Sequence, residues 1–270
     1  MSDRYAVFGN PVSHSRSPDI HHAFAAQRGE DLVYERIEAP VDGFPAAVTA
    51  FFDGGGRGAN VTVPFKEEAH GLCGALTERA RQAGAVNTLW HRDGVLHGDN
   101  TDGAGLVADL RGQGWALAGK RLLVLGAGGA VRGVLGPLLA QAPAELVVAN
   151  RTVARAETLV ERFSGQGVAL HASALEALNG RFDVIINAIS AGLHGDMPAL
   201  PEGLVGDATV AYDMVYGARP TPFMEWADAA GAAAVRDGLG MLVEQAAEAY
   251  QVWRGWRPDT APVLARLRHG

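Results

Sequence analysis

The chain has 270 residues, of which 48% are hydrophobic and 20% charged, and its formal net charge is −7. This length and composition indicate an ordinary globular protein of about two domains. The acidic balance and the lack of Lys/Arg clusters argue against nucleic acid or an anionic membrane as a partner. A lone Cys73 excludes an intramolecular disulfide and a cysteine-based metal site. The opening segment MSDRYAVFG lacks the features of a secretory signal and no apolar run could span a bilayer, so we expect a cytoplasmic protein.

Strand and helix patterns alternate over the first hundred residues. Ser17 before Pro18 predicts a helix N-cap, Thr77 predicts another, and Asp93-Gly94 is typical of a hairpin turn. These signals predict an α/β domain with a mixed sheet over residues 1–101. The predicted strands cover residues 5–8, 32–37, 59–63, 85–90 and 95–98, and the helices 18–28, 44–52, 66–70 and 77–82.

A glycine-rich turn between two apolar runs organises the second half of the chain. The run Leu122–Leu125 is followed by the turn Gly126–Ala130 and then by a helical pattern, with a second apolar run at Glu145–Ala149. Strand, glycine turn, helix and strand form the unit that binds a dinucleotide, because glycines let the backbone approach the pyrophosphate at the helix N-terminus. Val131 stands where G-x-G-x-x-G has its third glycine, so the motif is a variant.

The residues that end the second apolar run indicate which dinucleotide binds. An NAD site places Asp or Glu here to bond the ribose 2′-hydroxyl. This chain has Asn150, Arg151 and Thr152, with Arg155 one helical turn further on. Two guanidiniums and a hydroxyl suit a 2′-phosphate, so we predict NADP. The alternative is that Thr152 caps a helix whose arginines are merely solvated.

The remaining strands and helices continue this parallel pattern. They predict a Rossmann-like domain over residues 102–238 with a parallel sheet. We expect the C-terminal helices, about residues 239–270, to complete the first domain, with a cleft between the two domains. The further strands are predicted at residues 168–171, 182–187 and 209–212, and the helices at 174–178, 221–230 and 239–255.

Polar residues in the first domain lie where open α/β sheets bind ligands. On a strand, Asn60 and Thr62 face one way and the neighbouring valines face the core, and Lys66 follows the end of the strand. Ser15 and Ser17 could bond a ligand carboxylate or hydroxyls, although helix capping also explains Ser17.

Two further polar residues need a partner or a role. Asn87 in the middle of an apolar strand is unfavourable unless it bonds something. Asp102 begins a helix at the domain junction, where an N-cap is the default interpretation. The histidines show no metal-binding spacing, so no metal is expected.

Read together, these residues describe a polar pocket beside a nicotinamide site. Nothing resembles a nucleophile with an adjacent base. The chemistry that fits is hydride transfer to a carbonyl, with Lys66 and Asp102 handling the proton. An ordinary lysine is charged at neutral pH and could protonate the developing alkoxide.

Eight motifs occur in the order and approximate spacing of shikimate dehydrogenases, which this chain resembles over nearly its whole length. The first four are much more specific than the glycine loop. They are YAVFGNPVSHSRSPDIHH, NVTVPFKE, AGAVNTL and GDNTDG, followed by GAGGA, NRTVAR, YDMVYG and DGLGMLVEQAA.

The resemblance implies reversible NADPH-dependent reduction of 3-dehydroshikimate to shikimate, a step toward chorismate and aromatic amino acids. It implies that Lys66 is the acid/base, assisted by Asp102, and that Tyr216 closes over the substrate. In the loop of residues 187–192, Ile189 stands where many members have Thr. The implied substrate residues are Ser15, Ser17, Asn60, Thr62, Asn87, Asp102, Tyr216 and Gln245. The implied cofactor residues are Gly126, Ala127, Gly128, Gly129, Ala130, Asn150, Arg151, Thr152, Arg155, Ile189, Met214 and Gly238.

Two alternatives remain open at this point. One is a quinate/shikimate dehydrogenase that also uses NAD, against which Arg151 and Arg155 argue. The other is a catalytically silent NADP-binding regulatory module, against which Lys66 and Asp102 argue. The expected partner is a small-molecule substrate, and the sequence leaves a homodimer open.

Overall fold

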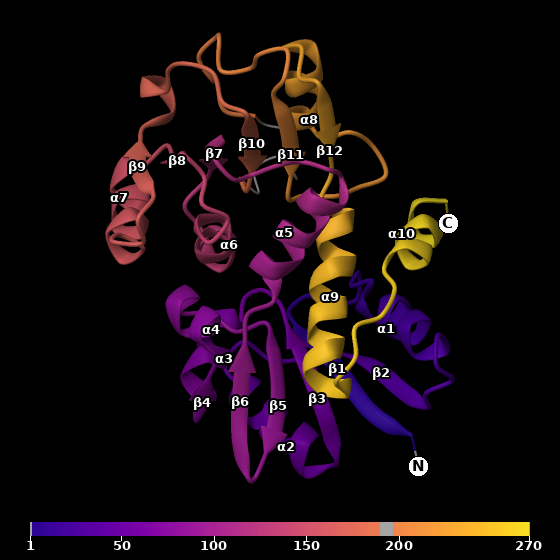
Figure 1. Ribbon diagram of the computed structural model, residues 1–270. Helices are drawn as coiled ribbons and strands as arrows, with labels where there is room; N and C mark the ends of the chain where they lie inside the picture. Colours follow the sequence, from indigo (N-terminus) through magenta and orange to yellow (C-terminus); the bar gives the residue numbers. More distant parts are fainter. Residues whose placement is uncertain (1, 190–196, 270) are drawn as a thin grey trace. The chain divides into compact units, whose positions relative to one another are not determined.

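The computed structural model describes residues 2–189 and 197–269. The chain divides into two compact units, unit 1 with residues 1–105 and 242–270, and unit 2 with residues 106–241. It leaves unit 1 within helix α5 (Asp102–Gly112) and returns within helix α9 (Leu239–Arg254). Each unit contains one six-stranded sheet with helices packed against it (Figure 1).

Unit 1 has a mixed sheet in the strand order β2-β1-β3-β5-β6-β4. The pairs β1–β2, β1–β3 and β4–β6 are parallel, whereas β3–β5 and β5–β6 are antiparallel. This arrangement confirms the predicted α/β class. The elements of this unit besides α5 and α9 are β1 (Asp3–Gly9), α1 (Ser17–Ala26), β2 (Leu32–Glu38), α2 (Phe44–Asp53), β3 (Gly56–Val61), α3 (Lys66–Leu72), β4 (Ala75–Leu76), α4 (Glu78–Ala83), β5 (Thr88–Arg92), β6 (Val95–Asp99) and α10 (Ala261–His269).

Local signals account for several of these elements. Thr77 caps α4 as predicted, because its side chain accepts a hydrogen bond from the Ala80 N–H. The β5–β6 turn is also as predicted, since Asp93 and Gly94 have φ values of 53° and 76°, which a two-residue hairpin turn requires. On one face of the sheet, α2 contributes a row of buried aromatic and aliphatic side chains to the core, Phe44, Val48, Phe51 and Phe52.

Unit 2 has an entirely parallel sheet in the order β12-β11-β10-β7-β8-β9. The predicted helix at 174–178 is a short 3-10 turn (Leu175–Ala177), and the three-residue strand β12 was not predicted. The other elements are β7 (Arg121–Leu125), α6 (Gly129–Leu139), β8 (Glu145–Ala149), α7 (Val153–Arg162), β9 (Ala169–Ser173), β10 (Val184–Asn187), β11 (Val210–Asp213), α8 (Pro222–Ala229) and β12 (Ala234–Arg236).

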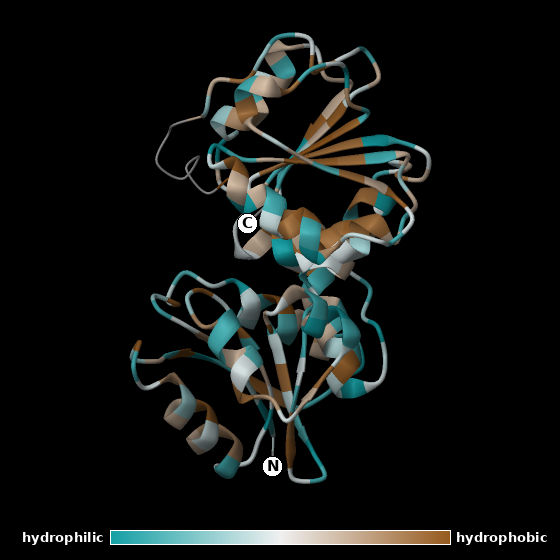
Figure 2. Ribbon diagram, turned by 90° about the vertical axis from the view of Figure 1, so that its left-hand side faces the viewer, coloured by the Kyte–Doolittle hydropathy of each residue, from teal (hydrophilic) through white to brown (hydrophobic). Residues whose placement is uncertain are grey.

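The four central strands of unit 2, β7, β8, β10 and β11, are buried on both faces, which is why they are almost entirely apolar. In β7, Leu122 and Val124 pack into the core with helices α6 and α7, whereas Leu123 and Leu125 pack into the opposite core with α8. Figure 2 shows these strands as hydrophobic along most of their length.

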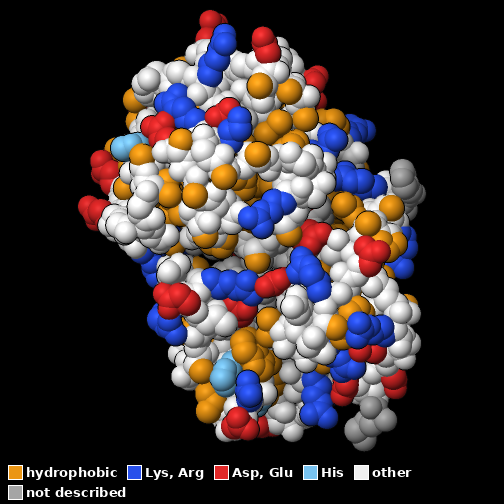
Figure 3. Space-filling model, viewed as in Figure 1, with side chains coloured by type: hydrophobic (Ala, Val, Ile, Leu, Met, Phe, Trp, Pro, Cys, Tyr) orange, Lys and Arg blue, Asp and Glu red, His pale blue; other side chains and the backbone are white. Residues whose placement is uncertain are grey.

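The surface is mixed in charge. Acidic and basic side chains are interspersed over the face shown in Figure 3. Among the helices that the structure describes, none combines the length and apolar character needed to cross a membrane.

Candidate functional site

An ion pair at the start of two helices lies at the centre of the polar residues of unit 1. Lys66 is the first residue of α3 and Asp102 the first residue of α5, and Lys66 Nζ lies 2.6 Å from Asp102 Oδ2. The side chains are 27% and 11% exposed, so the pair is largely shielded but still reachable from solvent. The Asp102 side chain is therefore committed to Lys66 rather than to capping its own helix.

The amide of Asn87 orients the second oxygen of Asp102. Its Nδ2 donates to Asp102 Oδ1 at 2.8 Å and to Thr101 Oγ1 at 3.0 Å, while its Oδ1 accepts from Thr101 N at 2.9 Å. Asn87 is buried, and the need for a partner that the sequence indicated is met by these bonds. Its position differs from the prediction, because β5 begins at Thr88 and Asn87 lies just before the strand.

Helix α9 brings Gln245 to the same group. Gln245 Oε1 accepts from Asn87 Nδ2 at 3.4 Å and from Thr101 Oγ1 at 3.5 Å. The approach is close because Gly105 has no side chain, and a Cβ there would lie 2.6 Å from Gln245 N. Thr101 contacts both amides and was not among the predicted site residues; its place in the polar run GDNTDG is the signal that could have identified it.

Asn60 lies near the end of β3, and Thr62 follows the strand directly, with its N–H donating to Phe8 O at 2.8 Å. Asn60 is buried and its Nδ2 donates to Asn87 O at 3.1 Å and Thr88 Oγ1 at 3.3 Å. The prediction that Val63 faces the core is wrong, since Val63 is 64% exposed. The strand ends at Val61, so the alternation of faces does not continue to Val63.

The two predicted serines lie beside the start of α1. Ser15 Oγ donates to Ser17 Oγ at 3.1 Å, and Ser17 is buried. Ser17 is not the N-cap as predicted, because the helix begins at Ser17 itself and Arg16 holds the cap position without a side-chain bond. Among the described residues, neither serine hydrogen-bonds directly to Lys66 or Asp102.

A buried ion pair fixes the segment that leads into Asp102. Arg79 donates from two nitrogens to Asp99, at 2.7 and 2.6 Å, and Asp99 Oδ1 also accepts from Asn100 N at 2.7 Å. Burial would raise the pKa of the Asp99 carboxyl, but the hydrogen bonds and charge of Arg79 outweigh it and lower the pKa. Asn100 Oδ1 then accepts from Asp102 N at 3.2 Å, so this segment positions the catalytic candidate.

In unit 2 the glycine turn lies between β7 and α6. Gly126 has a φ of 109°, a backbone conformation that favours glycine. A Cβ on Gly128 would meet no atom within 4 Å, so this side of the turn is open to a ligand. The predicted residues from Gly128 to Ala130 are exposed, and Ala127 is partly buried against the core. The turn therefore presents backbone at the helix N-terminus, as a pyrophosphate site requires.

The four residues predicted to select the cofactor follow β8. Asn150 Nδ2 donates to Thr152 O at 2.9 Å, which shapes the turn. Thr152 holds the N-cap position of α7, but its side chain makes no capping bond. Arg151 and Arg155 are exposed, and no ion pair or hydrogen bond engages either guanidinium among the described residues. Both cations are thus available to a phosphate group.

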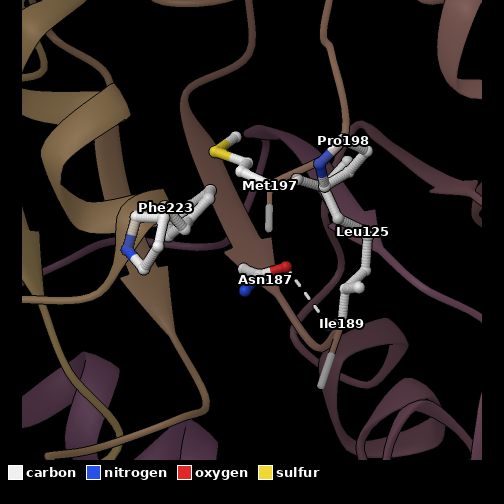
Figure 4. A pocket seen from close by; sticks show the side chains of 7 residues that line it. Leu125, Asn187, Ile189, Met197, Pro198 and Phe223 are labelled. Atoms are coloured by element: carbon white, nitrogen blue, oxygen red, sulfur yellow. Dashed lines mark hydrogen bonds between the residues drawn. The ribbon is translucent and has the colours of Figure 1, made fainter. Parts of the chain in front are cut away.

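Ile189 lies at a small pocket in unit 2 that Figure 4 shows (Leu125, Asn187, Ile189, Met197, Pro198, Pro222 and Phe223). Asn187 Oδ1 accepts from Ile189 N at 3.1 Å and Asn187 Nδ2 donates to Asp213 Oδ1 at 3.0 Å. These bonds fix the backbone at the carboxyl end of β10, where a parallel sheet binds its ligand. Residues 190–192 of the predicted loop lie outside the described residues.

Gly238 and Met214 are in direct contact. A Cβ on Gly238 would lie 2.3 Å from the Met214 carbonyl oxygen, so only glycine fits there. Tyr216 also belongs to unit 2, in the segment after β11, whereas every other predicted substrate residue belongs to unit 1. Within the part of the chain that the structure describes, no three His, Cys, Asp or Glu side chains gather as a metal site would require.

Comparisons with known proteins find three family models that match segments of this chain. The model described as "Shikimate dehydrogenase substrate binding domain" matches residues 7–89, "Shikimate / quinate 5-dehydrogenase" matches residues 108–194, and "Shikimate 5'-dehydrogenase C-terminal domain" matches residues 238–268.

Individual relatives are similar over almost the whole chain. The shikimate dehydrogenase (NADP(+)) of Alcanivorax borkumensis is 66% identical, with 98% of this chain and 96% of that protein covered. The crystal structure of an Ael1 enzyme from Pseudomonas putida has a TM-score of 0.94 at 46% identity, covering 98% of both chains. The shikimate 5-dehydrogenase of Thermus thermophilus in complex with NADP(H) and shikimate has a TM-score of 0.88 at 34% identity, covering 99% of both chains.

Proposed function

The chain belongs to the shikimate dehydrogenase family, and we propose that it catalyses the reversible NADP-dependent reduction of 3-dehydroshikimate to shikimate. The observation that carries this proposal is the Lys66–Asp102 pair within a cluster of amides and hydroxyls of unit 1. This reaction belongs to the pathway to chorismate and aromatic amino acids.

We propose that unit 1 binds the substrate. The hydroxyls of Ser15 and Ser17 would hold the carboxylate, and Asn60, Thr62, Asn87 and Gln245 would hold the ring hydroxyls. The hydrogen bonds that join Ser15 to Ser17, Asn60 to Asn87 and Asn87 to Gln245 hold these side chains in place, which lowers the entropy cost of binding a small polyol. We propose that Tyr216 of unit 2 closes over the substrate.

Proton transfer would fall to Lys66. In the reducing direction its ammonium group polarises the ketone and gives a proton to the developing alkoxide. In the oxidising direction the amine accepts the hydroxyl proton. Asp102, at 2.6 Å, stabilises the charged form, and its bond from Asn87 fixes the carboxylate so that Lys66 Nζ stays in one place.

We propose that unit 2 binds NADP. Gly126, Gly128, Gly129 and Ala130 would approach the pyrophosphate, and Arg151, Thr152 and Arg155 would bond the 2′-phosphate, with Asn150 shaping the turn. Ala127, Ile189, Met214 and Gly238 would line the rest of the site. Bound NADPH supplies the hydride. The fit rests on the open side of Gly128 and on two guanidiniums without protein partners among the described residues.

A steady-state assay tests the proposal. Purified protein is given shikimate or quinate with NADP or NAD, and the absorbance of the reduced cofactor is followed. We expect turnover of shikimate with a strong preference for NADP. Preference for NAD would contradict the role of Arg151 and Arg155, and the absence of turnover with either alcohol would favour a silent NADP-binding module.

Two further properties stay predictions. A cytoplasmic location is tested by fractionation of cells that express the protein. Self-association as a homodimer is tested by sedimentation equilibrium of the purified protein.

A further inference from the structure

A buried tyrosine on β2 bonds the Asn60 side chain. Tyr34 OH donates to Asn60 Oδ1 at 2.7 Å, and both residues are buried. Figure 1 shows the strands that carry them, β2 and β3, on either side of β1. Tyr34 was not singled out in the sequence, because a tyrosine on a strand is ordinarily explained by packing.

The phenol is held in one place and in one protonation state. Its ring stacks on His21 with the centroids 4.4 Å apart and the planes 6° from parallel. Burial lowers the pKa of His21 to about 3, so this neighbour is uncharged at neutral pH. Burial also raises the pKa of Tyr34 well above its usual 10, against the hydrogen bond from Ser17, so the phenol keeps the proton that it donates to Asn60.

This bond leaves Asn60 little freedom. Its two Nδ2 protons go to Asn87 O and Thr88 Oγ1, and Tyr34 uses one of the two lone pairs of Oδ1. Turning the amide over would set Oδ1 against the Asn87 carbonyl oxygen, which can only accept, and would require the Tyr34 hydroxyl to rotate and accept from Nδ2, so the present orientation is favoured. Because both Nδ2 protons are used, a ligand that reaches Asn60 can only donate to Oδ1.

We propose that Tyr34 is a positioning residue for substrate recognition, which locks the Asn60 amide so that Asn60 accepts, and does not donate, a hydrogen bond from a substrate hydroxyl. This inference rests on the proposed function, in which Asn60 binds shikimate. Tyr34 itself acts only through Asn60.

A double-mutant cycle of Y34F and N60A tests the proposal. Y34F keeps the stacked ring and removes the hydroxyl, so we expect the KM for shikimate to rise about fivefold with kcat nearly unchanged. In the N60A background, Y34F should change KM no further, because the residue it positions is gone. Equal effects of Y34F in both backgrounds, or an unchanged KM in the single variant, would overturn the proposal.

A matched control is Y250F. Tyr250 is another buried tyrosine that stacks near His21, with its ring centroid 5.9 Å away, but its hydroxyl donates to Glu30. We expect Y250F to leave the KM for shikimate unchanged. A rise equal to that of Y34F would mean that loosening the aromatic cluster, and not release of Asn60, causes the effect.

A measurement without substrate separates this proposal from the proposed function. The side-chain amide of Asn60 gives two proton signals in NMR spectra of the ligand-free protein, assigned by their loss in N60A. We expect the two signals to stay distinct and exchange slowly with solvent in the wild type and in Y250F, and to exchange faster in Y34F. Unchanged exchange in Y34F would refute the proposal that Tyr34 holds the Asn60 amide. Faster exchange in Y34F without any turnover of shikimate would refute only the proposed function.

Discussion

Replacing Lys66 by alanine tests the proton-transfer role directly. General acid–base catalysis contributes about 10²- to 10⁴-fold to a rate, and we expect kcat in K66A to fall within that range. The KM for shikimate should change much less, because the hydroxyls and amides of Ser15, Asn60 and Gln245 are not bonded to Lys66. Asp102 keeps its bond from Asn87 at 2.8 Å, so the site should keep its shape. Steady-state kinetics with shikimate and NADP give both parameters.

A second substitution separates charge from proton transfer. K66R keeps a cation beside Asp102, but a guanidinium does not release its proton at neutral pH, so kcat should stay low. The control is K120A in unit 2, where Lys120 pairs with Asp183 at 3.4 Å and is 44% exposed, and it should leave kcat unchanged. If K66A raised KM strongly at an unchanged kcat, Lys66 would be a binding residue and the mechanism above would be refuted.

Two further predictions concern the cofactor and the effect of pH on stability. Replacing Arg151 and Arg155 by alanine should raise the KM for NADP about tenfold or more, because charge-assisted bonds to a 2′-phosphate are lost. The KM for NAD should stay nearly unchanged. An equal rise in KM for both cofactors would contradict this role of the two arginines. The Arg79–Asp99 pair should stabilise the fold by an amount that is fully present above the unfolded pKa of about 3.9 and is lost as pH falls through the lowered folded pKa. D99N should therefore lower the unfolding free energy by about 3 kcal/mol at neutral pH. Urea titrations should show that the difference in unfolding free energy between D99N and the wild type becomes smaller below about pH 4. A difference that stays constant down to pH 3 would rule out the pair as its source.

Where the chain repeats a simple pattern, the sequence predicts the fold well. The runs Leu122–Leu125 and Glu145–Ala149 are strands of a parallel sheet, as expected, because strands buried on both faces must be apolar throughout. The turn Gly126–Ala130 was recognisable for a similar reason, since only glycine tolerates the backbone conformation at Gly126. Such features are local, so each can be read from a few neighbouring residues.

Strand ends were predicted less well. A two-residue alternation placed Val63 inside and Asn87 within a strand, yet β3 ends at Val61 and β5 begins at Thr88. The alternation says which face a residue takes while the strand lasts, but pairing with a neighbouring strand decides where it stops. The three residues of β12 are too few to show any alternation.

The candidate site could be predicted as a set of residues but not as a hydrogen-bond network. Lys66, Asn87 and Asp102 stood out because their types and positions were unusual. The partners that orient them are harder to identify: Thr101 is marked only by its place in the polar run GDNTDG, and Arg79 is of a type so common on helices that nothing in its immediate sequence marks it. The sequence does not show which segments, distant in the chain, are joined by these hydrogen bonds, or which side chain donates in each.

The position of Gln245 depends on contacts that lie far from the candidate site. It reaches Asn87 only because α9 runs along unit 1, and the anchors of α9 are at its other end. Trp253 packs against Gly58, where a Cβ would lie 2.5 Å from its Nε1, and that Nε1 donates to Leu89 O at 3.1 Å. Arg254 pairs with Asp3 at 2.5 Å and with Glu30 at 3.1 Å. These contacts fix the rotation and height of the helix, and a rigid helix carries that register over two turns to Gln245. The glycine at position 58 thus helps to place Gln245, a proposed substrate residue, without touching the site, because it lets the indole of Trp253 set the register of α9.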